Sequence, residues 1–370
     1  MTAEATVYQR NERLDQFRKF TMAHPRLVAA RDELVDAIEG ATPGSLVMVL
    51  GPTGVGKTTL RAKVEQLLQQ QMPPDSGHLP FVSVEVPPPH TGRFRWRDYF
   101  SRLLAAMNEP LIHAKRVRVC SNAPTPVATI VRDTDLSFAA EQALRHRQPP
   151  AVFVDEAQHL GLVASGRKLS DQLDVIKSIA NRTGTVHVLF GTYELLAFRN
   201  LSAQLSRRCI DLHFRRYRAD SSEDREIFQS VLLTFQKQLP FESKDTDLPA
   251  MWEFLYERSV GCVGIVKEWL VRASVRAIRH GAPSLTREQL EVTALSISQC
   301  EKILAESREG ETRLNDSEDA QLRLRTLLGI EQHIAPVAPN PATPNRRAAK
   351  VGQRSPQRDP IREEGVAAYV

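Results

Sequence analysis

The sequence predicts an α/β fold with a five-stranded parallel sheet, followed by a small region made only of helices. Five apolar, strand-like runs alternate with helix-like segments: 46–50, 81–86, 151–157, 186–192 and 210–214. After about residue 220 the apolar residues recur at helical spacing only, over 223–239, 248–259, 264–280 and 285–298. From about residue 333 the chain is rich in Pro and Arg without periodicity, which predicts a disordered tail.

A glycine-rich loop follows the first predicted strand, in the stretch VMVLGPTGVGKTTL. Its spacing fits G-x-x-x-x-G-K-[ST], the P-loop, whose backbone N–H groups curl around phosphates while the next helix adds its positive end. Lys57 is expected to bridge the β- and γ-phosphates, and the Thr58 hydroxyl to bind Mg²⁺. The sequence therefore predicts ATP as the ligand of Gly51, Pro52, Thr53, Gly54, Val55, Gly56, Lys57, Thr58 and Thr59.

Two adjacent carboxylates end the third predicted strand, in AVFVDE. Asp155 is expected to hold Mg²⁺, and Glu156 to polarise the attacking water. The next strand ends in FGT, which predicts Thr192 as a polar sensor of the γ-phosphate, with an ordinary turn threonine as the alternative. Lys267 opens a later helix and is a candidate second sensor, with a plain surface lysine as the alternative.

An arginine pair, Arg207 and Arg208, precedes the fifth strand. In a sheet of this kind that edge faces a neighbouring subunit, where an arginine can neutralise transition-state charge on the adjoining nucleotide. Either residue fits this role, which requires a homo-oligomer. The alternative is a solvated basic end of a helix.

A basic segment lies between the second and third strands. Residues 90–118 carry seven Lys and Arg side chains against two acidic ones. Such a surface predicts phosphate contacts to double-stranded DNA that are largely independent of sequence, with a solvated helix face as the alternative. The proposed contacts are Arg93, Arg95, Lys115, Arg116 and Arg118. Trp96, Phe100, Leu103 and Met107 recur at helical spacing in the same segment and are expected in the core.

Composition limits the remaining possibilities. A net charge of +5 permits nucleic acid as a partner. The four cysteines form no C-x-x-C pair, so neither a zinc site nor a disulfide framework is predicted. No apolar run approaches the roughly 18 residues of a membrane span. These features predict a cytoplasmic protein without a membrane partner.

The motifs, in this order, resemble the AAA+ ATPases of the ORC-like branch: the P-loop, VFVDEAQHL, LFGTYELL, LSRR and a helical lid. DEAQHL, LDVIKSIAN and GTYELL more narrowly resemble the TniB/TnsC group of transposition ATPases, which includes those of CRISPR-associated transposons. The resemblance covers about residues 10–295. It implies an ATP-dependent homo-oligomer, ring or filament, that assembles on DNA, connects a target-selection protein to the transposase and disassembles on hydrolysis. An arginine is usual where Lys267 stands, which is a departure from the pattern.

The sequence pattern and this resemblance together predict five regions. They are an N-terminal helical extension (1–44), an AAA+ α/β nucleotide-binding subdomain (45–220), a helical lid (221–300), a helical extension (301–332) and the tail (333–370). Two alternatives share the nucleotide motifs. One is a secretion- or signalling-type AAA+ ATPase that acts on protein partners without DNA. The other is a scaffold that binds ATP without hydrolysis, which the presence of Glu156 disfavours.

Overall fold

The computed structural model describes residues 3–73, 77–88, 94–115, 132–161, 169–199, 207, 209–241, 246–315 and 318–330. The chain divides into two compact units, Met1–Asn315 and Asp316–Val370. The predicted tail from residue 333 onward lies outside the described residues.

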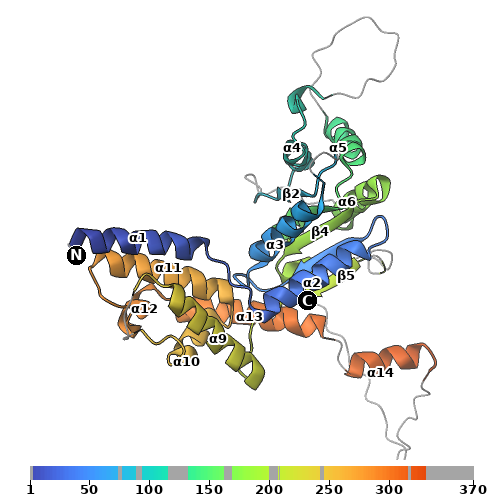
Figure 1. Ribbon diagram of the computed structural model, residues 1–370. Coiled ribbons are helices and arrows are strands. Elements are labelled where there is room, and N and C mark those ends of the chain that lie inside the picture. The colour runs from blue at the N-terminus through green and yellow to red at the C-terminus, as the bar shows by residue number, and fades with distance from the viewer. Residues whose placement is uncertain are drawn as a thin grey trace, which may run out of the picture. The chain divides into compact units, whose positions relative to one another are not determined.

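A five-stranded parallel sheet forms the centre of the first unit (Figure 1). Its strands are β1 (Leu46–Leu50), β2 (Val82–Glu85), β3 (Ala151–Asp155), β4 (Val186–Gly191) and β5 (Cys209–His213), in the order β2-β3-β4-β1-β5. Every pairing is parallel, and Leu50 of β1 lies beside both Gly191 and His213. The predicted fold class is therefore confirmed, and the carboxyl ends of β1, β3 and β4 share one edge.

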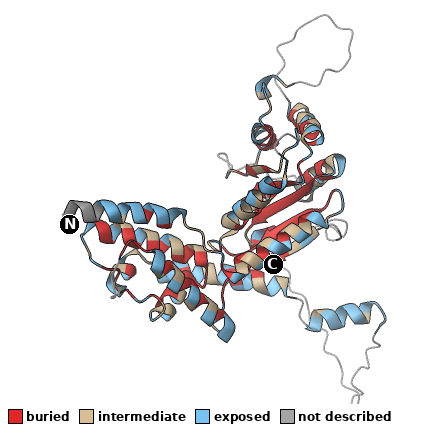
Figure 2. Cartoon of the chain, in the orientation of Figure 1, coloured by how far each residue is buried: buried red, intermediate tan, exposed pale blue. Residues whose placement is uncertain are grey.

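Helices cover both faces of this sheet. One face packs against α2 (Pro25–Glu39) and α3 (Lys57–Gln71). The other packs against α4 (Trp96–Ala106), α5 (Asp133–Arg147) and α6 (Leu169–Thr183). Strands β1, β3 and β4 are buried along their whole length (Figure 2), because each contributes alternate side chains to the two cores. The predicted core residues of α4 and its end are all buried: Trp96, Phe100, Leu103 and Met107.

Short elements connect these layers. Within the described residues they are three 3-10 helices, η1 (Ile112–Ala114), η2 (Ala157–Gly161) and η3 (Tyr193–Leu195), and the short helix α7 (Leu196–Arg199). Helices η2 and η3 follow β3 and β4 directly, so they lie at the carboxyl edge of the sheet, where ligands bind in open α/β folds.

A second core is formed by helices and the loops between them. It contains α1 (Ala3–Lys19), α9 (Ser222–Gln238), α10 (Trp252–Ser259), α11 (Val263–Arg279) and α12 (Arg287–Thr293). Trp269 is buried at its centre, and its indole N–H donates to the Leu290 carbonyl at 2.8 Å. Leu14 and Phe17 of α1 join this core, and α1 lies along α11 in Figure 1. The first 44 residues thus contribute to two cores, because α1 packs against the helices of the second core and α2 packs against the sheet.

The helix expected over residues 285–298 is wrong as a single element. Helix α12 ends at Thr293, and Ala294 has an extended backbone with ψ 157°. A new helix, α13 (Ile297–Leu314), begins after Ser296, whose hydroxyl accepts from the Gln299 N–H at 3.3 Å while the Gln299 side chain accepts from the Ser296 N–H at 2.9 Å. This capping box satisfies the first turn of α13 and favours a new start over continuation.

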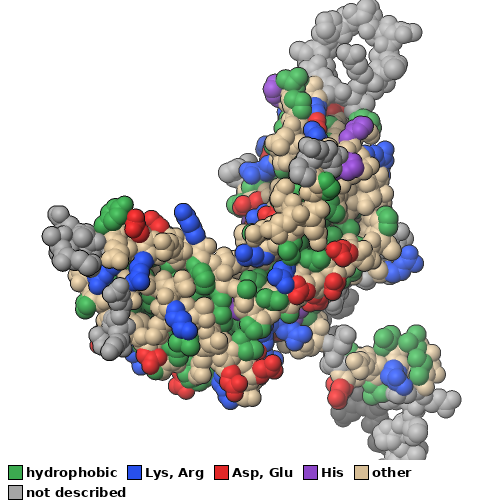
Figure 3. All heavy atoms as spheres, in the orientation of Figure 1, with side chains coloured by type: hydrophobic (Ala, Val, Ile, Leu, Met, Phe, Trp, Pro, Cys, Tyr) green, Lys and Arg blue, Asp and Glu red, His purple; other side chains and the backbone are tan. Residues whose placement is uncertain are grey.

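The second unit contains α14 (Glu318–Leu327) among its described residues. Leu322, Leu324, Leu327 and Leu328 are all exposed, Leu327 by 85%, and Figure 3 shows hydrophobic side chains gathered on this helix. None of the described helices in either unit combines the length and apolar character that a bilayer crossing requires.

Candidate nucleotide-binding site

The predicted P-loop connects the end of β1 to the start of α3. Gly54 and Gly56 both have positive φ, 71° and 113°, which glycine adopts without strain. A Cβ on Gly54 would lie 2.4 Å from Cγ1 of Ile265, and the Ile265 N–H donates to the Gly54 carbonyl at 3.2 Å. Position 54 therefore has no room for a side chain, and the loop lies against the first turn of α11.

Lys57 begins α3 and folds its side chain back over the loop. Its ammonium donates to the carbonyls of Gly51 and Pro52, at 3.0 and 2.9 Å. Burial lowers the pKa of Lys57, while the nearby carboxylates of Glu156 and Asp155 act in the opposite direction. Phosphate oxygens would supply stronger, charged acceptors than these carbonyls, so the side chain is suited to bind a nucleotide.

Thr58 and Asp155 meet at the carboxyl edge of the sheet. The Thr58 hydroxyl donates to Oδ2 of Asp155 at 3.3 Å, and the Glu156 N–H donates to Oδ1 of the same carboxylate at 3.0 Å. A hydroxyl and a carboxylate are the oxygen ligands that Mg²⁺ takes in such sites, so the pair fits this ion. Arg61 was not predicted here, yet its Nε lies 3.3 Å from Oδ2 of Asp155.

Glu156 stands one residue beyond β3 with a positive φ of 52°, a conformation that side chains seldom adopt. Its Oε2 accepts from the side-chain amide of Gln158 at 2.5 Å. The carbonyl oxygen of that amide accepts from the Thr192 N–H at 3.4 Å. Gln158 thus joins two predicted site residues, and the only signal for it was its place in DEAQHL.

Thr192 follows β4 and lies in the same pocket as the P-loop residues. Its side-chain oxygen is buried and has no hydrogen-bond partner among the described residues. A buried polar atom without a partner is costly, so this hydroxyl is suited to meet a ligand oxygen.

The helical core supplies the opposite wall of this pocket, which has a volume of about 660 Å³. Lys267 lies in it as predicted, and its ammonium donates to the Arg18 carbonyl at 3.0 Å. Partial burial lowers the pKa of Lys267. Arg18 of α1 and Arg272 of α11 also line the pocket, although neither was predicted. No sequence motif indicates that their helices, α1 and α11, lie beside the P-loop, so these two arginines could not be predicted.

The remaining predicted residues lie away from this pocket or outside the described chain. Arg207 is exposed just before β5, whereas Arg208 lies outside the described residues. Arg95 is exposed at the start of α4. Lys115 is already paired, because its ammonium lies 2.8 Å from Oε2 of Glu109. Three further predicted DNA contacts lie outside the described residues: Arg93, Arg116 and Arg118.

Comparisons with known proteins give one family match and several similar solved structures. Residues 41–199 match the family described as AAA domain. The Cdc6p structure from Pyrobaculum aerophilum is similar, with a TM-score of 0.50 and 15% identity over 74% of this chain and 67% of that chain. The Aeropyrum pernix ORC1 protein in complex with DNA gives a TM-score of 0.49 at 18% identity, over 83% and 71% of the two chains. Among curated proteins, none matches this sequence.

The family match lies on the sheet region, where the site is. Residues 41–199 match the family model described as AAA domain, and the likeness to Cdc6p concerns the fold alone. At the carboxyl edge of the sheet, P-loop residues, Glu156 and Thr192 line one pocket, and Asp155 is hydrogen-bonded to Thr58 of that pocket.

Proposed function

We propose that the protein binds and hydrolyses ATP with Mg²⁺ in this pocket. The observation that carries the proposal is the convergence of Lys57, Thr58 and Glu156 on one cavity from two separate strands and their loops. Lys57 would neutralise the β- and γ-phosphates, and Thr58 with Asp155 would hold the ion that bridges them. Glu156 would orient the attacking water, and Thr192 and Lys267 would contact the γ-phosphate side.

An arginine from a second copy completes the site in this proposal. Arg207 is exposed at the edge strand of the sheet, which leaves its side chain accessible to a neighbouring molecule. Arg208, beside it in the chain, is the other candidate. Such an arginine stabilises the charge that develops on the transferred phosphoryl group, so hydrolysis would depend on assembly into a ring or filament.

Double-stranded DNA is the proposed surface for that assembly. The exposed arginines Arg95, Arg97 and Arg102 accompany α4, whose apolar side is buried in the core. Their charges are therefore available to phosphates, and nothing in their arrangement favours base edges. Lys115 can add to this contact once its pairing with Glu109 opens. Arg93, Arg116 and Arg118 extend the same basic segment in the sequence.

The proposed role is that of a transposition regulator of the TniB/TnsC type, which connects a target-selection protein, CRISPR-associated in some systems, to the transposase. What supports this finer assignment is the resemblance of DEAQHL, LDVIKSIAN and GTYELL to that group. Hydrolysis would then disassemble the oligomer from the target DNA. The alternative is an ATPase that acts on protein partners and does not bind DNA, and the following test distinguishes the two.

The test is binding to unrelated DNA duplexes over a range of salt concentrations, with ATP, ADP or no nucleotide. We expect ATP-dependent binding of similar strength to every duplex. Replacing Arg95, Arg97 and Arg102 by Ala should flatten the logarithmic salt dependence by about one unit per lost phosphate contact. Lys302→Ala, on α13, is the matched control for loss of an exposed charge. An ATPase that ignores DNA would instead favour the protein-partner role.

The transposition role needs a separate experiment. In a reconstituted insertion reaction with a transposase and its donor DNA, wild-type protein should direct insertion and Lys57→Ala should not. DNA binding that persists without any effect on insertion would reject this role and leave the DNA-dependent ATPase in place.

A further inference from the structure

Helix α13 extends from the helical core to the nucleotide-binding edge of the sheet. Near its start, Cys300 is buried and its Sγ lies 3.5 Å from the Arg258 carbonyl of α10. At its end, Leu314 packs against the core of the sheet region. One continuous helix therefore contacts both parts of the first unit.

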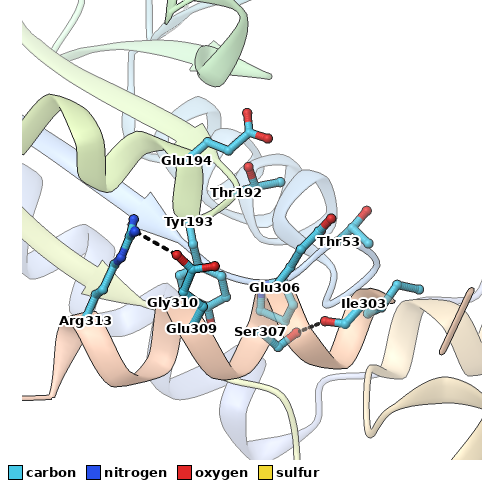
Figure 4. A pocket seen from close by; sticks show the side chains of 11 residues that line it. Thr53, Thr192, Tyr193, Glu194, Ile303, Glu306, Ser307, Glu309, Gly310 and Arg313 are labelled. Carbon is cyan, nitrogen blue, oxygen red and sulfur yellow. Dashed lines mark hydrogen bonds and ion pairs between the residues drawn. The ribbon is translucent and has the colours of Figure 1, made fainter. Parts of the chain in front are cut away.

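Gly310 allows this helix to lie directly on Tyr193. A Cβ at Gly310 would stand 2.0 Å from Cγ of Tyr193 and 2.4 Å from both Cδ atoms, so any side chain would displace the ring or the helix. Figure 4 shows Tyr193 pointing from the end of β4 toward α13 at Gly310. Thr192 precedes Tyr193 in the chain, and η3 begins at Tyr193. The position of the ring therefore constrains the backbone of Thr192.

Two further contacts hold Tyr193 and α13 in place. The Tyr193 hydroxyl lies 2.8 Å from Nε2 of His213 at the end of β5. Burial lowers the pKa of His213 to about 4, so the neutral ring can accept this hydrogen bond. Directly after Gly310, Glu311 of α13 forms a two-point ion pair with Arg216, at 2.8 and 3.2 Å. Both side chains of that pair are largely buried.

One cavity is lined both by residues of α13 and by residues of the nucleotide site. Figure 4 shows this cavity, of about 250 Å³, with Glu306 and Gly310 on one side and Thr53 and Thr192 on the other. Thr53 and Thr192 also line the larger nucleotide pocket. Of these two residues, Thr192 is the one that directly precedes Tyr193, so a shift of α13 can reach the nucleotide pocket through it.

We propose that α13 is a positioning element for Thr192: through Gly310 and Tyr193 it sets the orientation of the threonine hydroxyl toward the γ-phosphate of ATP. The inference rests on the proposed function of the pocket. By linkage, a γ-phosphate held by Thr192 stabilises the docked position of α13 in return. The docked position of α13, which extends to residue 314, is then more stable with bound ATP than with bound ADP.

The experiment measures affinity for a non-hydrolysable ATP analogue and for ADP in the full chain. Gly310→Ala should weaken the analogue about tenfold, the effect of one lost hydrogen bond, and leave ADP binding unchanged. Thr192→Ala should have the same effect. The double variant should be no worse than Thr192→Ala alone, because both changes act on one interaction.

Controls separate positioning from damage to the fold. Alanine favours helix more than glycine does, so melting of α13 does not explain a loss in Gly310→Ala. Thr312→Ala, at an exposed position of the same helix, should leave both affinities unchanged. Hydrogen exchange of α13 should slow more with the ATP analogue than with ADP.

Three results would overturn the inference: equal losses for both nucleotides in Gly310→Ala, full affinity in that variant, or additive losses in the double variant. Each leaves ATP hydrolysis by the wild type intact. A wild-type protein that binds neither nucleotide would overturn the proposed function together with this inference, so the two failures are distinguishable.

Discussion

The side-chain amide of Gln158 donates a hydrogen bond to the carboxylate of Glu156 across 2.5 Å. Through its carbonyl oxygen the same amide accepts from the Thr192 N–H. The residue proposed to orient water and the residue proposed to sense the γ-phosphate are therefore held by one side chain. A charge-assisted bond of this length restricts where the carboxylate can point.

Gln158→Ala should lower the rate of ATP hydrolysis by about tenfold, part of what a positioned base contributes, because the Glu156 carboxylate loses its fixed direction. Affinity for ATP should change little, since Lys57 and the loop backbone remain. Phosphate release measured at saturating ATP checks the rate, and Gln70→Ala, exposed on α3, is the control. A rate equal to that of the wild type would show that the contact with Gln158 has no part in hydrolysis.

Lys57→Ala should weaken ATP binding by roughly a hundredfold, because the phosphates lose a charged donor in a buried loop. Equilibrium binding of a fluorescent ATP analogue checks this loss. Lys63→Ala removes a lysine from the same helix, where its ammonium lies 3.4 Å from the Gln66 side chain, and should bind ATP normally. Undiminished affinity in Lys57→Ala would reject the P-loop as the nucleotide site.

Arg207→Ala, or Arg208→Ala if that residue is the finger, should bind ATP normally and hydrolyse it slowly. An arginine supplied by a neighbour is worth about 10³ to 10⁵ in rate in the best-studied ATPases and GTPases. Mixing the variant with Lys57→Ala protein should restore part of the activity, because some interfaces then combine an intact pocket with an intact arginine. If the mixture gains no activity, the arginine either acts on the nucleotide of its own subunit or has no part in catalysis.

Much of the fold could be predicted because buried parallel strands have a clear pattern. The runs predicted as strands over 46–50 and 151–157 correspond to β1 and β3, and the glycine spacing predicted the loop before Lys57. The break between α12 and α13 was missed, because apolar spacing continues across Ala294 while a local capping box at Ser296 decides the boundary.

The far wall of the pocket was the harder part to predict. Arg18 and Arg272 come from helices whose sequences show only amphipathic spacing, and their place beside the P-loop depends on tertiary packing. The contact of Gly310 with Tyr193 joins residues over a hundred positions apart in the sequence. A lone glycine within a helical pattern gave no indication of its partner.

Acid should destabilise the fold through His187, which is fully buried in β4 and has no partner for Nε2 among the described residues. Burial lowers its pKa from 6.5 to about 4, so between these values the unfolded chain binds a proton that the folded chain excludes. Stability should therefore fall as the pH drops from 6.5 to about 4, by up to roughly 3 kcal/mol from this residue.

Urea unfolding at several pH values measures the effect on stability. His187→Leu should show a shallower fall in the free energy of unfolding over this range, because the variant has no imidazole to protonate. His280→Asn, at the exposed end of α11, is the control and should keep the wild-type slope. His24 and His213 have pKa values lowered to about 4 by burial as well, so the variant should retain part of the pH dependence. An unchanged slope in His187→Leu would show that other groups cause the acid sensitivity.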